Sequence, residues 1–271
     1  MAAFTAQPAL SDVLRENCVD EICIEFTQGD DQVDFVAVNN FEHVTISLVF
    51  TLDLDNMRFA GTDGLLFQIP PQSRRALFWL EPERNGSWAY EFEYFYRFGS
   101  VFGQHDPDIV YRLPVESGRR VKISQSCGGL FSHRPPREHA IDIPLPRGEE
   151  VRASRDGKVV FVKEDSSRGG PTEAFMDDGN ELLVEHGDGS IGVYTHFVKD
   201  GIAVEPGDRI SAGDLVGYVG STGWSSGPHI HFEVVYPDRA SPELEWQTVA
   251  VPFDTKEGVV TCPKSGFLTA K

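Results

Sequence analysis

Two histidines at alternate positions of one apolar segment are the sharpest chemical feature of this sequence. The segment is Gly-Pro-His-Ile-His-Phe-Glu-Val at residues 227–234, so one residue separates His229 from His231. In an extended strand, residues i and i+2 point to the same face, which places the two imidazoles side by side. Such a pair can bind a metal ion or place a base beside one. The alternative is a pair of surface histidines on a half-exposed strand.

Other side chains in the same part of the chain could complete a metal site. Residues 131–236 hold six of the eight histidines, including His133 and His196, and Asp142 lies in an alternating apolar segment. A catalytic zinc ion commonly takes three protein ligands and keeps a fourth position for water. Two histidines and one carboxylate meet that requirement, and the remaining histidines can move protons. Spacing alone does not assign these roles.

Short β-strands are predicted to carry these residues, because apolar and polar residues alternate along most of the chain. In the first 115 residues the alternation occurs at 33–37, 44–50, 77–80 and 88–98. Asn85-Gly86 predicts a hairpin turn between the last two of these segments. Regularly spaced short strands indicate an immunoglobulin-like β-sandwich, and only Leu10 to Glu16 shows weak helical periodicity. We therefore expect an all-β protein.

Changes in composition divide the chain into four parts. Residues 1–115 are predicted to form the β-sandwich domain with an N-terminal extension, and residues 116–130 a linker that contains Glu-Ser-Gly and Cys-Gly-Gly. Residues 131–240 form the histidine-rich domain, built on an antiparallel sheet. Residues 241–271 are expected to be a C-terminal extension that packs on that domain through a strand near Val249–Phe253.

Composition and charge exclude several classes of protein. Hydrophobic residues make up 40% and charged residues 24%, which is ordinary for a globular chain that buries a core. No apolar run approaches the roughly 18 residues of a membrane span. The formal net charge of −18 disfavours binding to nucleic acid or to an anionic membrane surface.

The cysteines and the start of the chain leave the compartment open. Four cysteines permit two disulfides or four reduced thiols, and the spacing of Cys18 and Cys23 is not a zinc-knuckle pattern. The first residues lack the basic region and the apolar core of a signal peptide. The protein is therefore expected to be either cytosolic or a mature form whose leader is missing.

The histidine-rich domain resembles the lysostaphin-type (LytM-like) zinc metallopeptidases, which cut peptidoglycan peptides. The resemblance covers residues 131–236 and extends with weaker motifs to the N-terminal sandwich. It begins with Ser132-His133, nine residues before Asp142. The further matching motifs are Ala140-Ile141-Asp142-Ile143, Tyr194-x-His196, Gly220-Ser221-Thr222-Gly223 and Gly227-Pro228-His229-Ile230-His231-Phe232.

The resemblance implies a role for each candidate site residue. His133, Asp142 and His231 would hold the zinc ion, whereas His196 and His229 would flank the attacking water without binding the metal. Many family members have the first histidine four residues before the aspartate, where this chain has Glu138, so His139 remains an alternative to His133. The remaining histidine of this domain, His186, is expected to be structural.

The implied activity is zinc-dependent endopeptidase hydrolysis of peptide cross-links in bacterial peptidoglycan, through a metal-activated water. Such an enzyme would be periplasmic or secreted, and its partners would be peptidoglycan peptides, with no nucleic acid and no membrane insertion. That setting favours a Cys18–Cys23 disulfide and permits a Cys127–Cys262 pair. Two alternatives remain: a catalytically silent member that binds the cell wall or activates another wall hydrolase, and a peptidase that acts on an ordinary protein.

Overall fold

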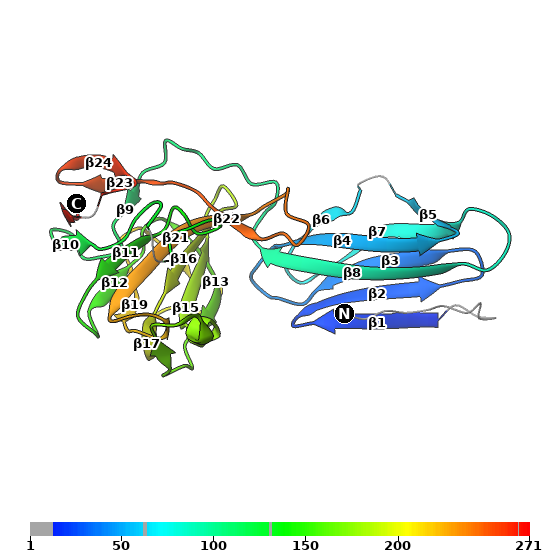
Figure 1. The fold of residues 1–271 in the computed structure, drawn as a ribbon, viewed down its shortest axis with the longest axis horizontal. Coiled ribbons are helices and arrows are strands. Elements are labelled where there is room, and N and C mark those ends of the chain that lie inside the picture. Colours follow the sequence, from blue (N-terminus) through cyan, green and yellow to red (C-terminus); the bar gives the residue numbers. More distant parts are fainter. Residues whose placement is uncertain (1–12, 62–63, 130–131, 265) are drawn as a thin grey trace. The chain divides into compact units, whose positions relative to one another are not determined.

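The computed structural model describes residues 13–61, 64–129, 132–264 and 266–271, and these are mostly strands (Figure 1). The chain divides into two compact units. One contains Met1–Val101 with Pro237–Glu245, and the other contains Phe102–Tyr236 with Trp246–Lys271. The predicted all-β class is confirmed. In the described ranges, no helix is long and apolar enough to cross a membrane.

The described part of the N-terminal unit contains two sheets. The larger sheet has the order β1 (Val13–Val19), β2 (Ile22–Gln28), β3 (Val33–Asn39), β7 (Ser73–Pro82) and β5 (Met57–Ala60). The smaller sheet has the order β6 (Leu66–Ile69), β4 (Ile46–Asp55) and β8 (Ala89–Phe98).

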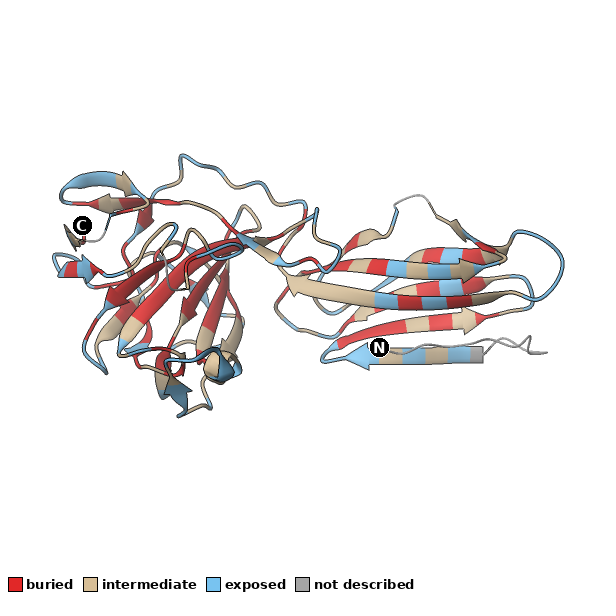
Figure 2. Cartoon of the chain, in the orientation of Figure 1, coloured by how far each residue is buried: buried red, intermediate tan, exposed pale blue. Residues whose placement is uncertain are grey.

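Aromatic rings from both sheets meet in one core. Phe35 of the larger sheet lies 5.2 Å from Phe92 of the smaller sheet between ring centroids. Phe78 and Phe50 make a second contact at the same 5.2 Å separation. Buried and exposed residues alternate along several of these strands (Figure 2), as expected where one sheet face packs inward. The two sheets therefore form a sandwich, whose immunoglobulin-like connectivity stays a prediction.

Two local predictions for this unit are wrong. Asn85-Gly86 does not close a hairpin, because β7 pairs with β3 and β5 whereas β8 pairs with β4 in the other sheet. Asn85-Gly86 instead lies in the connection between the two sheets. Both β7 and β8 can therefore point aromatic side chains into the shared core. The weak helical periodicity of Leu10 to Glu16 is overridden at residues 13–16, which lie in β1 and pair with β2, whereas residues 10–12 lie outside the described residues.

A seven-stranded sheet forms the centre of the C-terminal unit. Its order is β11 (Ile141–Pro144), β21 (His229–Pro237), β16 (Ile191–Thr195), β15 (Glu181–Glu185), β13 (Gly157–Lys163) and β18 (Arg209–Ile210), with β22 (Trp246–Thr248) also paired to β21. The successive pairs from β11 to β18 are antiparallel, as the sequence predicts for this domain.

Smaller sheets and one short helix surround the central sheet. One three-stranded sheet contains β12 (Glu150–Arg152), β19 (Leu215–Val219) and β17 (Phe197–Ile202), and another contains β24 (Gly258–Thr261), β23 (Pro252–Thr255) and β9 (Tyr111–Arg112). Two further strand pairs are β10 (Arg120–Ile123) with β25 (Gly266–Thr269) and β14 (Gly169–Gly170) with β20 (Gly223–Trp224). The helix is the 3-10 helix η1 (Glu173–Asp178).

The structure differs from the predicted linker at residues 116–130. Val121 and Ile123 of β10 are buried in the same hydrophobic core as β11 and β21. Residues 246–271 also belong to this unit, because β25 pairs with β10 and β23 pairs with β9. The glycine and serine content of residues 116–130 suggested a linker. The alternating residues Val121 and Ile123 instead bury this segment in the core.

Both expected disulfides are present. Cys18 and Cys23 are cross-strand partners on β1 and β2 and are bonded to each other. Cys127 is bonded to Cys262, which lies 135 residues further along the chain. The second bond ties the segment before β11 to the C-terminal strands, so it braces the part of the unit that carries His133.

Candidate metal centre

One row of polar side chains crosses the central sheet. The strand registers place Asp142 opposite His231, His231 opposite Thr195, and Thr195 opposite Glu181. Side chains at directly paired positions point to the same sheet face. Their sequence neighbours Phe232, Tyr194 and Leu182 are buried in the hydrophobic core. Strict alternation along these strands therefore builds a core on one face and a polar site on the other.

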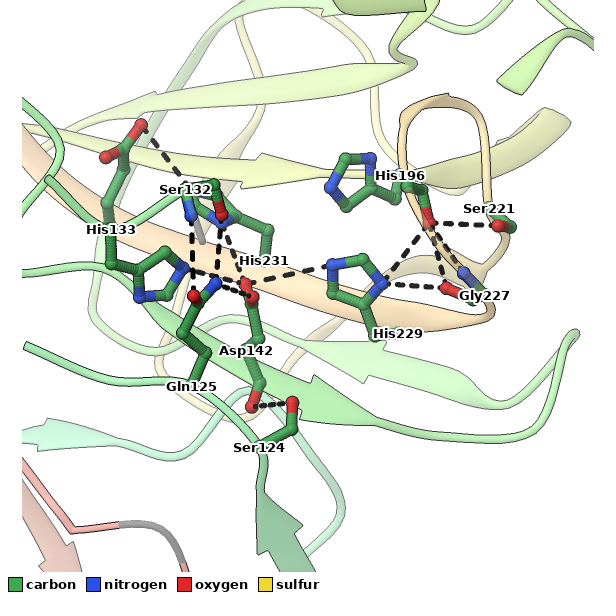
Figure 3. Close-up of polar contacts among 12 residues, drawn as sticks. Ser124, Gln125, Ser132, His133, Asp142, His196, Ser221, Gly227, His229 and His231 are labelled. Atoms are coloured by element: carbon green, nitrogen blue, oxygen red, sulfur yellow. Dashed lines mark hydrogen bonds and ion pairs between the residues drawn. The ribbon is translucent and has the colours of Figure 1, made fainter. Parts of the chain in front are cut away.

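His133 reaches this row from the segment that precedes β11. Its side chain is fully buried, and its Nε2 lies 3.1 Å from Oδ1 of Asp142 (Figure 3). Its Nδ1 lies 3.2 Å from the carbonyl oxygen of Ser126. A carbonyl can only accept a hydrogen bond, so Nδ1 donates to Ser126 and Nε2 is the ring nitrogen that faces the aspartate.

Asp142 is the point at which the site residues meet. Its Oδ1 also lies 2.9 Å from Nδ1 of His231 and 3.8 Å from Nε2 of His229 (Figure 3). Its Oδ2 accepts a hydrogen bond of 2.9 Å from the side-chain amide of Gln125. Burial opposes ionisation of Asp142, but hydrogen bonds from His133 and His231 outweigh it and hold the Asp142 pKa well below its usual range. The carboxylate is therefore charged.

His231 is fixed from both ring nitrogens. While Nδ1 faces Asp142, Nε2 lies 3.5 Å from Oε1 of Glu233. Burial alone would lower the His231 pKa, but the two carboxylates outweigh it and raise the pKa to about 9. A buried carboxylate on the far nitrogen is a common support for a metal-binding histidine, since it orients the ring and raises its basicity.

The donor set fits a zinc ion. One ligand atom each from His133, Asp142 and His231 lies within 4.8 Å of the others, and all three residues are buried. Two imidazoles and one carboxylate are a ligand set that catalytic zinc sites use. The second nitrogen of each histidine contacts an oxygen, from Ser126 or Glu233, as such sites require.

His196 and His229 lie beside this cluster without joining it. Their ring centroids are 4.4 Å apart, and His196 lies 6.0 Å from His231. Each contacts a backbone carbonyl through Nδ1, at 2.6 Å from Thr222 and 2.8 Å from Gly227 respectively. Burial lowers the pKa of His196 to about 3 and also lowers that of His229. Both rings are therefore neutral near pH 7 and keep Nε2 as a proton acceptor.

A pocket of about 290 Å³ opens beside His231 and His196. Arg137, Lys163 and Glu181 line it together with Glu233. The further lining residues are Ser132, Met176, Asp177, Gly179, Val193, Thr195, Trp224 and Trp246. The pocket is thus large enough for a side chain of a bound peptide and is lined by charges of both signs.

The structure separates the two remaining histidines of this domain from the cluster. His139, the alternative first ligand, has Nδ1 3.1 Å from the carbonyl oxygen of Thr248. His186 is buried with Nδ1 2.9 Å from the carbonyl oxygen of Asp156, and burial lowers its pKa to about 4. Neither belongs to the described group of potential ligands around Asp142.

Gln125 and Glu233 contact the site but were missed from the sequence. Glu233 follows His229 and His231 at the same two-residue spacing, so the alternation could have placed it on the site face. Gln125 lies in the predicted linker. It contacts Asp142 through a β-bridge and a side-chain hydrogen bond, and both depend on tertiary structure that brings these segments together. The sequence carried no comparable signal for Gln125.

Comparison with known proteins finds relatives for part of this chain. Residues 137–242 match the profile of Peptidase family M23. A 130-residue stretch is 30% identical to peptidoglycan DD-endopeptidase ShyA of Vibrio cholerae and covers 47% of this chain and 27% of ShyA. A 93-residue stretch is 36% identical to DD-carboxypeptidase/endopeptidase Mpg of Neisseria meningitidis and covers 34% of this chain and 19% of Mpg. The matches thus span less than a third of each relative.

Among solved structures, similarity is found to a mutant catalytic domain of the prophage-encoded M23 protein EnpA from Enterococcus faecalis. The identity is 27%, the TM-score is 0.32, and the match covers 55% of this chain and 95% of that domain. The stretch that matches Peptidase family M23, residues 137–242, contains Asp142 and His231 of the buried cluster, and His133 lies just before it.

Proposed function

We propose that this protein is a zinc-dependent endopeptidase that hydrolyses peptide cross-links of bacterial peptidoglycan. The observation that carries the proposal is the convergence of His133, Asp142 and His231 in an M23 domain. Zinc supplies a Lewis acid that polarises the scissile carbonyl and lowers the pKa of water toward about 7.

The ligand roles follow from the hydrogen bonds. His133 would bind the metal through Nε2 because its Nδ1 is held by Ser126. His231 would bind through Nδ1 because its Nε2 faces Glu233. Asp142 would use Oδ1, the oxygen nearest both rings, while Gln125 holds Oδ2. These contacts fix the three donor atoms before the metal arrives, which limits the reorganisation that binding requires.

His196 and His229 supply proton transfer. Both are neutral and fixed through Nδ1, so each presents Nε2 as a base. The ring that takes the proton of the attacking water becomes an imidazolium. Its Nε2–H can then hydrogen-bond the oxyanion and pass the proton to the leaving amine.

The relatives support the substrate and the location. ShyA is named as a peptidoglycan DD-endopeptidase and Mpg as a DD-carboxypeptidase/endopeptidase. We therefore assign the protein to the space outside the cytoplasmic membrane, either the periplasm or the exterior, where peptidoglycan is found. The two disulfides fit such an oxidising compartment.

Metal analysis combined with digestion of purified peptidoglycan tests the proposal. The wild-type protein should hold one equivalent of zinc and generate new peptide ends, whereas His231→Ala should lose both. His139→Ala is the matched control, because this histidine lies outside the cluster, and it should keep zinc and activity. Zinc without cleavage would favour the silent, wall-binding alternative, and absence of zinc from wild type would contradict the assigned centre.

A further inference from the structure

A single segment, residues 221–227, supplies the hydrogen-bond acceptors of both proposed proton-transfer histidines. Nδ1 of His196 lies 2.6 Å from the carbonyl oxygen of Thr222. Nδ1 of His229 lies 2.8 Å from the carbonyl oxygen of Gly227 (Figure 3). A carbonyl can only accept a hydrogen bond, so both rings donate through Nδ1. The position of each ring therefore depends on how firmly this segment is held.

The Thr222 end of the segment is held by the threonine's own side chain. Its Oγ1 accepts a hydrogen bond of 3.0 Å from the backbone nitrogen of Asn180 and donates one of 2.9 Å to the carbonyl oxygen of Phe197. All three residues are buried. Gly227 has no side chain, so a neighbouring residue has to hold the carbonyl group that His229 contacts.

The hydroxyl of Ser225 makes these contacts. Ser225 is only 4% exposed, and its Oγ donates a hydrogen bond of 2.8 Å to the carbonyl oxygen of Gly227. The same Oγ lies 3.4 Å from the backbone nitrogen of Gly227 and 3.3 Å from Nδ1 of His229. Oγ of Ser221 lies 2.9 Å from it and is the donor, because the single hydroxyl proton of Ser225 is already used. One buried hydroxyl thus contacts both polar groups of Gly227 and the imidazole.

Loss of this hydroxyl would loosen the ring of His229. The Gly227 carbonyl would lose a donor and Ser221 would lose this acceptor, and unmade hydrogen bonds of partly buried groups cost free energy. The Cβ–Cγ torsion of a histidine has broad, roughly two-fold minima, so the torsion itself does not select which ring edge faces a given group. A flip would turn Nε2 of His229, which lies 3.8 Å from Oδ1 of Asp142, away from the cluster.

We propose that Ser225 is a positioning residue, which holds the ring of His229 with Nε2 toward the candidate metal centre. Ser225 acts through Gly227, and it is not among the described residues that line the pocket beside His231. The orientation of the ring is a property of the fold and can be measured without substrate, whereas its effect on cleavage rests on the proposed endopeptidase function.

Nuclear magnetic resonance of the ring nitrogens tests the orientation of His229. The sample is the full chain with isotope-labelled histidine and added zinc, and His229→Gln identifies the signal by its absence. Wild type should show a ring whose Nδ1 carries a proton that exchanges slowly with solvent. In Ser225→Ala this proton signal should be lost through faster exchange. Ser225→Thr keeps the hydroxyl and should retain the signal.

Kinetics separate positioning from substrate binding. With a soluble cross-linked muropeptide dimer, Ser225→Ala should lower kcat roughly 10- to 100-fold, because a small displacement of a catalytic group costs a rate factor of that order. KM, zinc content and circular dichroism should equal those of wild type, and Ser225→Thr should restore most of kcat. Ser226→Ala is the matched control, because Ser226 is the exposed neighbour, and it should match wild type in the ring signal and in kcat.

The outcomes distinguish this role from the proposed function. An unchanged ring signal or an unchanged kcat in Ser225→Ala would overturn the positioning role. Loss of zinc together with the signal would also overturn it, since the hydroxyl would then support the whole centre. Failure of wild type to cleave the dimer would contradict the proposed endopeptidase function, whereas loss of the signal in zinc-loaded Ser225→Ala would still support the hold of Ser225 on His229.

Discussion

Asp142 sets the arrangement of the candidate metal centre at the scale of single residues. One oxygen, Oδ1, lies within hydrogen-bond distance of both His133 and His231, so these three groups hold one another in place. The backbone of His196 adds a constraint of another kind, because its φ of 80° lies in the left-handed region that non-glycine residues seldom adopt. Strain of this kind concentrates at functional sites, where surrounding contacts enforce it. Here Asn180 and Thr222 hold His196 by hydrogen bonds.

Replacing Glu233 by glutamine should weaken zinc binding. The substitution keeps the size of the side chain but removes the charge that faces Nε2 of His231, so the ring loses basicity and orientation. Outer carboxylates of this kind are worth about 10- to 100-fold in metal affinity. Competition with a chromogenic chelator measures the zinc dissociation constant. Glu205→Gln, an exposed substitution in the same unit, should leave it unchanged, and equal affinities for both variants would remove Glu233 from the centre.

The central sheet shows how far elements could be predicted from the sequence. Alternation placed His229 and His231 on one face and their neighbours in the core, and the structure agrees. Alternation within a strand does not predict which strands pair with each other. The sequence therefore did not indicate that Glu181 lies in the same row as His231. The failed Asn85-Gly86 hairpin has the same cause, since strand pairing depends on distant residues that bury a shared core.

Gly220 supports the position of His196 through close backbone packing. A Cβ atom at this position would lie 2.5 Å from the backbone nitrogen of Val198 and 2.6 Å from the carbonyl oxygen of His196. Gly220→Ala should therefore destabilise the unit by about 1–3 kcal/mol, as overpacking does. It should also lower the rate of cleavage by displacing His196. Urea unfolding and peptidoglycan digestion measure the two effects.

Gly187→Ala provides the control for that experiment. No described atom lies within 4 Å of a Cβ built at Gly187, so this variant should match wild type in stability and in cleavage. If Gly220→Ala were as stable and active as Gly187→Ala, the close packing against the His196 backbone would not matter for the site.

At the scale of the whole molecule, buried histidines make stability depend on pH. Burial lowers the His186 pKa to about 4 in the folded protein, against 6.5 in an exposed histidine. The folded state therefore binds fewer protons than the unfolded state between these values, so stability is complete above pH 6.5 and falls as the pH drops toward 4. The loss should amount to roughly 3 kcal/mol for this group.

Comparison of wild type with His186→Gln isolates that contribution. Glutamine does not titrate, so the free energy of unfolding of the variant should decline less between pH 6.5 and pH 4 than that of wild type. Both proteins are loaded with zinc and unfolded in urea at each pH. Parallel pH profiles would show that His186 is not the group responsible.

The Cys127–Cys262 bond links distant parts of the chain to the metal centre. It closes a loop with a separation of 135 residues, whereas Cys18–Cys23 spans only 5, and the entropy removed from the unfolded chain grows with loop length. Replacing Cys127 and Cys262 by serine should destabilise the C-terminal unit by about 2–5 kcal/mol.

The same pair of serines should weaken zinc binding. Cys127 directly follows Ser126 and Gln125, which contact His133 and Asp142, so loosening this segment also loosens the outer contacts of two proposed ligands. Replacing Cys18 and Cys23 by serine is the control, and it should leave zinc affinity unchanged because these residues belong to the N-terminal unit. Equal zinc affinity in both double variants, measured by chelator competition, would mean that the long-range bond stabilises the fold without bracing the centre.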